Sequence, residues 1–351
     1  MLLKFKKLEL LDKIKNFKKV GDNPTFSIEN LTTPEIIESF GYPVEIHHVT
    51  TEDGYILELH RIPYGLDGPS ENRPVALLQH GLLSSSFDWI SDKPDRALVS
   101  LDFIFFRWDE MGTYDIPAAI DYTLSTTGNS QVYYVGFSMG TTMFFVLLSE
   151  KPEYVDKIKT ASLLAPVVYM NHMRGGLRAL ANYSDDFDRV LSLLGHYEFL
   201  PSDEAMTYLA NNFCLEDDIT EPICSNFLFL ISGYDPEEMN DDYIPVYLTH
   251  TPAGTSVHTL NHYAQLVYKD VWQKYDWGTI GNQQHYGQDT PPIYNLGEPL
   301  PPVAFFWGQN DYLAAPEDVA RLSTEINNLQ LNHRVEWDLW AHLDMPWGIQ
   351  R

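Results

Sequence analysis

Cysteine and long hydrophobic runs are both scarce in this sequence of 351 residues. No apolar stretch approaches the roughly 20 residues that a membrane-spanning helix needs, so no transmembrane segment is predicted. Cys214 and Cys224 are the only cysteines, and their spacing fits one local disulfide or two free buried thiols equally well. No cluster of cysteine, histidine and aspartate has the spacing of metal ligands, so we expect neither a metal nor another cofactor.

Positive charge is also scarce, because 23 lysines and arginines stand against 49 aspartates and glutamates. The net charge of −26 repels phosphate backbones, which argues against nucleic acid as a partner. Residues 1–20 are the exception, with seven lysines against Glu9 and Asp12. Apolar residues recur there at roughly helical spacing, which fits a basic amphipathic helix on an anionic membrane or, the interpretation we favour, a frayed terminal extension.

We assign residues 1–29 to this basic N-terminal extension. Lysines interrupt every candidate apolar core in it, so it lacks the pattern of a secretory signal peptide. The triplets Asn30-Leu31-Thr32 and Asn182-Tyr183-Ser184 make Asn30 and Asn182 glycosylation candidates, although such triplets are common by chance. The remaining chain is long enough, at 44% hydrophobic residues overall, for one large domain or a domain with a cap. It contains no internal repeat and no low-complexity tract.

The pattern that organises the chain is a strand-like run at Val132–Val135, then Gly136-Phe137-Ser138-Met139-Gly140, then a helix-like run at Thr141–Ser149. A strand, a sharp turn and a helix with G-x-S-x-G at the turn form a nucleophile elbow. The two glycines allow the tight turn, and the serine is lifted above the sheet edge close to a helix N-terminus. The motif also occurs by chance, but its strand and helix context favours a nucleophilic Ser138.

Strands and helices alternate on both sides of this elbow, which predicts an α/β fold with a mostly parallel sheet. An alternating hairpin around Asp53-Gly54 and a short capped helix at Thr33–Ser39 come first. We assign residues 30–168 and 298–351 to the core and residues 169–297 to a helical cap or lid, because the alternation stops in that block. The predicted core strands are Pro74–Gln79, Val132–Val135, Thr160–Val168, Val303–Trp307 and His333–Trp340.

Serine needs a base, and that base needs an orienting carboxylate. In α/β-hydrolases these groups follow the serine in the order acid, then histidine, each on a loop after a strand. Asp311 follows one predicted strand and His342 follows the next, with room for one helix between them. Asp318 falls inside that helix, and Asp344 is better placed to brace the histidine loop. We therefore predict the catalytic residues Ser138, Asp311 and His342.

The predicted mechanism is acyl transfer through an acyl-enzyme that water hydrolyses. The first strand after the hairpin ends in His80-Gly81-Leu82, the place where such folds build an oxyanion hole. Backbone N–H groups of Leu82 and Met139 are the expected donors. His80 itself is interpreted as structural.

Several stretches of the sequence together resemble the acid lipase family, to which gastric and lysosomal acid lipases belong. They are Tyr42-Pro43 with Thr51–Leu57, Gln79–Ser86, Asp109–Asp115, Gly136–Thr142, Leu164-Ala165-Pro166, Pro252–Val257, Tyr275–Gly278, Pro291–Asn295, Asn310–Ala314 and His342–Asp344. The resemblance covers roughly residues 30 to 349.

The resemblance implies an α/β-hydrolase core with a helical cap, acting on triacylglycerols or cholesteryl esters at a lipid–water interface. It carries the nucleophile, acid and base over to Ser138, Asp311 and His342, and the oxyanion donors to Leu82 and Met139. It also implies a cap disulfide between Cys214 and Cys224, glycosylation, and a secreted or lysosomal location. The oligomeric state is left open.

One departure from the family lies just upstream of the elbow. Family members have a further core strand between the counterparts of Leu101 and Asp109, and this sequence is too short there to hold it. Either Phe103–Phe106 serves as that strand or the sheet lacks one near residues 101–109. Two alternatives to a lipase therefore stay open: a catalytically impaired lipid-binding protein, and a carboxylesterase that acts on soluble esters.

Overall fold

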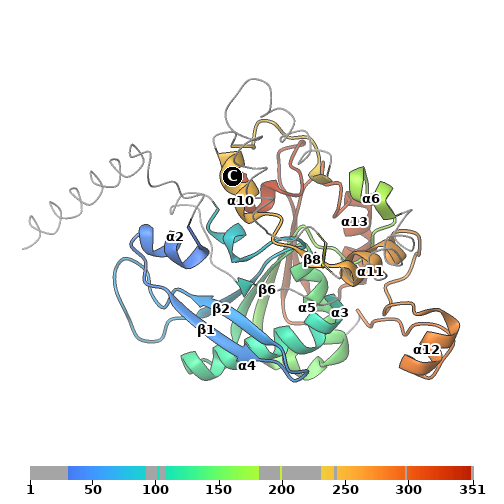
Figure 1. Ribbon diagram of the computed structural model, residues 1–351, viewed down its shortest axis with the longest axis horizontal. Coiled ribbons are helices and arrows are strands. Elements are labelled where there is room, and N and C mark those ends of the chain that lie inside the picture. The colour runs from blue at the N-terminus through green and yellow to red at the C-terminus, as the bar shows by residue number, and fades with distance from the viewer. Residues whose placement is uncertain are drawn as a thin grey trace, which may run out of the picture.

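The computed structural model describes residues 31–91, 101–102, 108–181, 198–199, 231–240, 243–296 and 299–348 (Figure 1). Several predicted features lie outside the described residues. They are the extension at 1–29, Asn30, Asn182, Cys214, Cys224 and the run at Phe103–Phe106. Within the described ranges, no helix is both long and apolar enough to cross a membrane.

The chain enters through α2 (Thr33–Ser39) and an antiparallel hairpin of β1 (Glu45–Thr50) and β2 (Ile56–Arg61). Glu35 caps α2 by accepting hydrogen bonds from the backbone N–H and the hydroxyl of Thr32, both at 2.8 Å. Gly54 turns the hairpin with a positive φ of 96°, which the absence of a side chain permits. Both predictions for this region are confirmed.

Five parallel strands form the central sheet, in the order β10-β9-β6-β5-β3. Their bounds are β3 Val75–Gln79, β5 Val132–Phe137, β6 Ile158–Leu164, β9 Val303–Trp307 and β10 Leu329–Arg334. The carboxyl ends of parallel strands meet at one edge of a sheet, and this places the loops after β3, β5 and β9 together.

The predicted position of the last strand was wrong. The sequence pattern indicated His333–Trp340, whereas β10 ends at Arg334. β10 lies at the edge of the sheet and is largely exposed, so it carries no strong apolar signal. The alternating residues beyond it lie outside the sheet, where Trp337 packs toward Asp235 and donates a hydrogen bond to it at 2.8 Å.

Helices flank the sheet (Figure 1). α5 (Met139–Glu150) follows the elbow strand and is buried over most of its length, while α13 (Pro316–Glu325) links β9 to β10. A short helical turn, α3 (Trp108–Glu110), and a π-helix, η3 (Met111–Asp115), lead into α4 (Ile116–Thr127). The short helix η4 (Pro152–Lys157) connects α5 to β6.

The block between β6 and β9 contributes the remaining elements. They are α6 (Gly175–Ala181), β7 (Glu198–Phe199), α10 (Ile244–His250), β8 (Thr255–Ser256), α11 (Val257–Val267) and α12 (Gly278–Tyr286). Trp108 stacks on His262 of α11 with ring centres 3.9 Å apart, and this contact ties the block to the core. Figure 1 shows α6, α10 and α11 above the sheet and α12 at the periphery.

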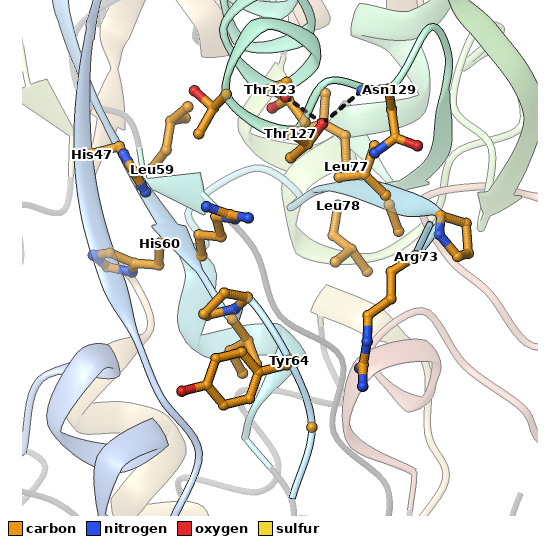
Figure 2. A pocket seen from close by; sticks show the side chains of 18 of the residues that line it. His47, Leu59, His60, Tyr64, Arg73, Leu77, Leu78, Thr123, Thr127 and Asn129 are labelled. Carbon is orange, nitrogen blue, oxygen red and sulfur yellow. Dashed lines mark hydrogen bonds between the residues drawn. The ribbon is translucent and has the colours of Figure 1, made fainter. Parts of the chain in front are cut away.

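In the described residues, β2 and β3 belong to two separate sheets. The two-residue strand β4 (Leu101–Asp102) pairs antiparallel with Leu59 and Glu58 of β2 and forms a separate three-stranded sheet with the hairpin. A cavity of about 640 Å³ opens between the two sheets, lined by residues of both β2 and β3, including Leu59, Leu77 and Leu78 (Figure 2). In the described part of the chain, no strand bonds to the side of β3 that faces away from β5.

Candidate active site

Ser138 occupies the turn between β5 and α5 with a φ of +52°. A positive φ is uncommon for a residue that has a Cβ, and tight packing is needed to hold it there. The glycines of the motif provide that packing. A Cβ on Gly140 would lie 2.4 Å from the carbonyl oxygen of Gln79, and one on Gly136 would lie 2.9 Å from the backbone of Gly140. The elbow therefore requires glycine at both positions.

Gly140→Ala is expected to destabilise the fold by about 2–4 kcal/mol, because the added methyl group meets the β3 backbone rather than a movable side chain. Urea unfolding followed by circular dichroism measures the change. Gly65→Ala is the matched control, since nothing lies within 4 Å of the Cβ position there. Its free energy of unfolding should stay within about 1 kcal/mol of wild type. Equal stability of the two variants would contradict the close approach of α5 to β3.

The hydroxyl groups of Tyr134 and Thr141 stabilise the turn at Ser138 by hydrogen bonds. Tyr134 donates to the carbonyl oxygen of Gly140 at 2.7 Å, and burial raises its pKa well above the ordinary value, so the phenol keeps its proton. Thr141 donates to the carbonyl oxygen of Ser138 at 2.6 Å and accepts the N–H of Val167 at 2.8 Å. These bonds join the elbow to β5 and to the loop after β6.

The three residues predicted from chain order meet in space. Nε2 of His342 lies 2.8 Å from Oγ of Ser138, and Nδ1 lies 2.8 Å and 3.0 Å from the two carboxyl oxygens of Asp311. The carboxylate of Asp311 can only accept a hydrogen bond, so Nδ1 of His342 carries the proton. Nε2 is then the nitrogen that accepts the hydrogen bond from the Ser138 hydroxyl. The three residues are 7%, 2% and 0% exposed in the order Ser138, His342, Asp311.

The carboxyl group of Asp311 is held in place by its own loop. Its Oδ1 accepts the backbone N–H groups of Leu313 and Ala314, both at 2.8 Å. Asp318, the rejected alternative, is buried on α13 and accepts from His172 instead. The carboxylate facing His342 is therefore that of Asp311.

The loops that carry Asp311 and His342 touch through a glycine that sequence reasoning missed. A Cβ on Gly308 would lie 2.1 Å from the carbonyl oxygen of Trp340, and the N–H of Asn310 donates to the same oxygen at 3.1 Å. Only glycine permits this approach. Its position directly after a predicted strand was a usable signal, but its contact partner could not be inferred.

Both expected oxyanion donors lie beside Ser138. Met139 begins α5, and the first N–H groups of a helix have no acceptor within the helix. Leu82 follows Gly81, where an added Cβ would lie 3.1 Å from the Cβ of Ser138. His80 is buried, with Nδ1 2.9 Å from the carbonyl oxygen of Gly81. The oxyanion roles of Leu82 and Met139 stay predictions.

A second missed contribution comes from residues 231–240. The carbonyl oxygen of Ser232 accepts the N–H groups of both His342 and Tyr312, each at 3.2 Å. A Cβ on Gly233, whose φ is +116°, would lie 2.2 Å from the carbonyl oxygen of Asn310. No local sequence pattern shows that this segment docks against two distant loops.

Buried acids surround the histidine loop on this side. Asp344, Asp235 and Glu238 are all almost fully buried. Burial raises the pKa of Asp344 to about 8; the N–H of Ala341 opposes the shift, and the charges of Asp235 and Glu238 add to it. In the described residues, no group of three or more histidine, cysteine, aspartate and glutamate side chains is arranged to hold a metal ion.

The sequence matches two known protein families and several curated relatives. Residues 33–93 match a family described as a partial α/β-hydrolase lipase region, and residues 77–346 match the α/β-hydrolase fold family. The chain is 38% identical to Lipase 3 of Drosophila melanogaster, over 90% of this chain and 88% of that protein. It is 36% identical to human gastric triacylglycerol lipase, over 90% and 86%. It is also 36% identical to human lysosomal acid lipase/cholesteryl ester hydrolase, over 91% and 87%.

Solved structures agree on the fold. A candidate lipase from Acinetobacter baumannii superposes with a TM-score of 0.51 at 12% identity, covering 93% of this chain and 92% of the other. At that identity the likeness concerns the fold alone.

Proposed function

The chain belongs to the acid lipase family of α/β-hydrolases, and on that premise we propose that it cleaves carboxylic esters of lipids with Ser138 as the nucleophile. Membership of the family supports lipid ester hydrolysis. The observation that carries the finer proposal is the chain of hydrogen bonds from Ser138 through His342 to Asp311. This order of nucleophile, base and orienting acid is what serine acyl transfer requires.

In the first step, His342 takes the proton of Ser138 at Nε2 as Oγ attacks the ester carbonyl carbon. Asp311 keeps the imidazole in the correct tautomer and stabilises the imidazolium that forms. The N–H groups of Met139 and Leu82 hold the oxyanion, a contribution of about 3–4 kcal/mol per donor in comparable enzymes. His342 then gives the proton to the departing alcohol, and the acyl group stays on Ser138.

In the second step, His342 removes a proton from water, which attacks the acyl-enzyme. The tetrahedral intermediate collapses, Ser138 regains its proton, and the fatty acid leaves. No step calls on a metal or an organic cofactor.

The proposed substrates are triacylglycerols or cholesteryl esters, after the activities in the names of the human relatives. Those names also lead us to propose a secreted or lysosomal location. The division into a core and a cap at 169–297 belongs to the same proposal. The disulfide between Cys214 and Cys224 and glycosylation at Asn30 and Asn182 remain predictions.

One observation favours a different function. In the described residues, no strand pairs with the side of β3 that faces away from β5, and a cavity lies between β2 and β3. A protein altered in this way could keep lipid binding and lose turnover. The intact geometry of Ser138, His342 and Asp311 weighs against that alternative, since a non-catalytic protein has no need of it.

Substrate preference is tested by comparing emulsified long-chain triacylglycerol and cholesteryl oleate with a soluble short-chain ester. We expect higher turnover on the emulsions, and a fluorophosphonate probe should modify the peptide that contains Ser138, as read by mass spectrometry. Activity confined to the soluble ester would indicate a carboxylesterase. Lipid binding without turnover or labelling, in protein shown to be folded, would establish the non-catalytic alternative.

A further inference from the structure

Three buried carboxyl groups meet beside the loop that carries His342. Asp344 follows this histidine by two residues and begins α14 (Asp344–Trp347). Asp235 and Glu238 belong to residues 231–240, on the other side of the loop. The residues are 5%, 0% and 2% exposed, in the order Asp344, Asp235, Glu238. Buried acids are rare unless they are paired or protonated, so this cluster calls for a physical explanation.

Asp344 closes the turn around His342. Its Oδ2 accepts the backbone N–H of Ala341 at 2.6 Å, and the N–H of Met345 donates to the carbonyl oxygen of His342 at 3.4 Å. The first bond spans His342, and the second ends on its carbonyl oxygen. The position of the imidazole therefore depends on where the carboxyl group of Asp344 is held.

Asp235 holds that carboxyl group from the facing segment. The indole N–H of Trp337 donates to Oδ2 of Asp235 at 2.8 Å, and the N–H of Glu237 donates to Oδ1 at 3.2 Å. Asp235 also raises the pKa of Asp344, through its charge and through a hydrogen bond between the two side chains. Two carboxyl groups can form such a bond only when one carries a proton. Because burial raises the pKa of Asp344, we assign the proton to Asp344.

We propose that Asp344 is a positioning residue whose protonated carboxyl, held by Asp235, keeps His342 aligned with Ser138, and that loss of this proton lowers ester hydrolysis at alkaline pH. The inference rests on the proposed function, because His342 is the base in that reaction. It deepens the proposal by adding a residue that does not touch the substrate.

The direction of the pH effect follows from the charges. Burial raises the pKa of Asp344 to about 8, so below that pH the acid keeps its proton and the pair stays intact. As the pH rises through that value, two carboxylates face each other in a space without water. Their repulsion separates residues 231–240 from the histidine loop, which lengthens the bond from the N–H of His342 to the carbonyl oxygen of Ser232.

Other titratable groups lie on the elements packed around α14. Asp88 lies on η2 (Ser86–Trp89), which packs against α14, and it is buried. Tyr247 of α10 stacks on Trp347, and Asp311 lies beyond His342. Among the charged groups around the loop, Asp235 and Glu238 are the ones whose charges raise the pKa of Asp344.

Asp344→Asn provides the sharpest test. The amide oxygen can still accept from Ala341 and the amide N–H₂ can donate to Asp235, but no proton can be lost. We expect kcat/KM on a soluble ester to fall at a pH at least one unit higher than in wild type on the alkaline side. Asp344→Ala, which lacks both bonds, should lose about 10-fold or more at every pH. Asp318→Asn, a buried acid on α13, should leave the alkaline limb unchanged.

Asp235→Asn is a second variant to measure if Asp344→Asn folds poorly. It also removes the repulsion between the two carboxylates, so its kcat/KM should likewise fall at a higher pH than that of wild type. The inference would be overturned if kcat/KM fell at the same alkaline pH in folded wild type and in a folded asparagine variant. Stability supplies a readout independent of catalysis. Between about pH 4 and 8 folded wild type binds a proton that the unfolded chain does not, so its stability in urea should fall as the pH rises, and less so in Asp344→Asn.

The same readout separates the two proposals. Wild type that neither hydrolyses esters nor reacts with a fluorophosphonate, yet shows this pH-dependent stability, would reject the proposed function and leave the carboxyl pair standing. If wild type is active, and Asp344→Asn changes neither the pH dependence of stability nor the alkaline fall in kcat/KM, only the inference about the carboxyl pair is rejected.

Discussion

Ser138→Ala is expected to lower kcat/KM for ester hydrolysis by about 10⁵-fold while leaving the fold intact. The hydroxyl of Ser138 lies 2.8 Å from Nε2 of His342, and without it no acyl-enzyme can form. The removed oxygen contributes little packing, so the free energy of unfolding should change by less than about 1 kcal/mol. Initial rates on an emulsified triacylglycerol and on a soluble ester measure the loss, and the fluorophosphonate adduct should disappear with it.

Ser162→Ala is the matched control for this variant. Ser162 lies on β6, the strand next to the elbow strand, where it pairs with Val135 of β5. Its activity should stay within about threefold of wild type. Residual hydrolysis by Ser138→Ala above a hundredth of the wild-type rate would show that another group is the nucleophile.

Asp311→Asn has the second largest expected effect, a loss of about 10⁴-fold in kcat. The amide oxygen can keep the bonds to the N–H groups of Leu313 and Ala314, so the loop should hold its shape. The amide N–H₂ then faces Nδ1 of His342 and forces that nitrogen to accept. Nε2 would carry the proton and could no longer take one from Ser138.

Asp318→Asn is the control for Asp311→Asn, because Asp318 is also a buried aspartate that hydrogen-bonds a histidine. That histidine is His172, away from Ser138, and activity should stay within about threefold of wild type. Circular dichroism and the urea midpoint show whether each variant is folded. If both variants lost activity equally, the loss would reflect general damage to the fold rather than the tautomer of His342.

The strands of the central sheet could largely be predicted, because buried parallel strands are continuous apolar runs. Val75–Gln79 and Val303–Trp307 were recognisable for that reason. The edge strand Leu329–Arg334 was misplaced, since one side of it faces solvent and its residues are mostly polar. Apolar periodicity reports burial, so an exposed strand leaves little trace in it.

Chain order was enough to select Ser138, Asp311 and His342 as candidates, because each follows a strand that ends at the same edge of the sheet. Local chemistry also made the elbow recognisable, since a tight turn after a strand needs glycine on both sides of the serine. These inferences depend on neighbouring residues and on the rule that parallel strands are aligned. Neither requires knowledge of distances across the fold.

Contacts between distant segments had to come from the folded chain. They include the 2.8 Å approach of His342 to Ser138, the docking of Ser232 against the histidine loop, and the burial of Asp344 that raises its pKa. The division of the described strands into separate sheets belongs with them, because strand pairing joins residues far apart in sequence. Local sequence patterns report secondary-structure propensity and burial. Distances between side chains and pKa values arise from packing, which depends on the whole chain.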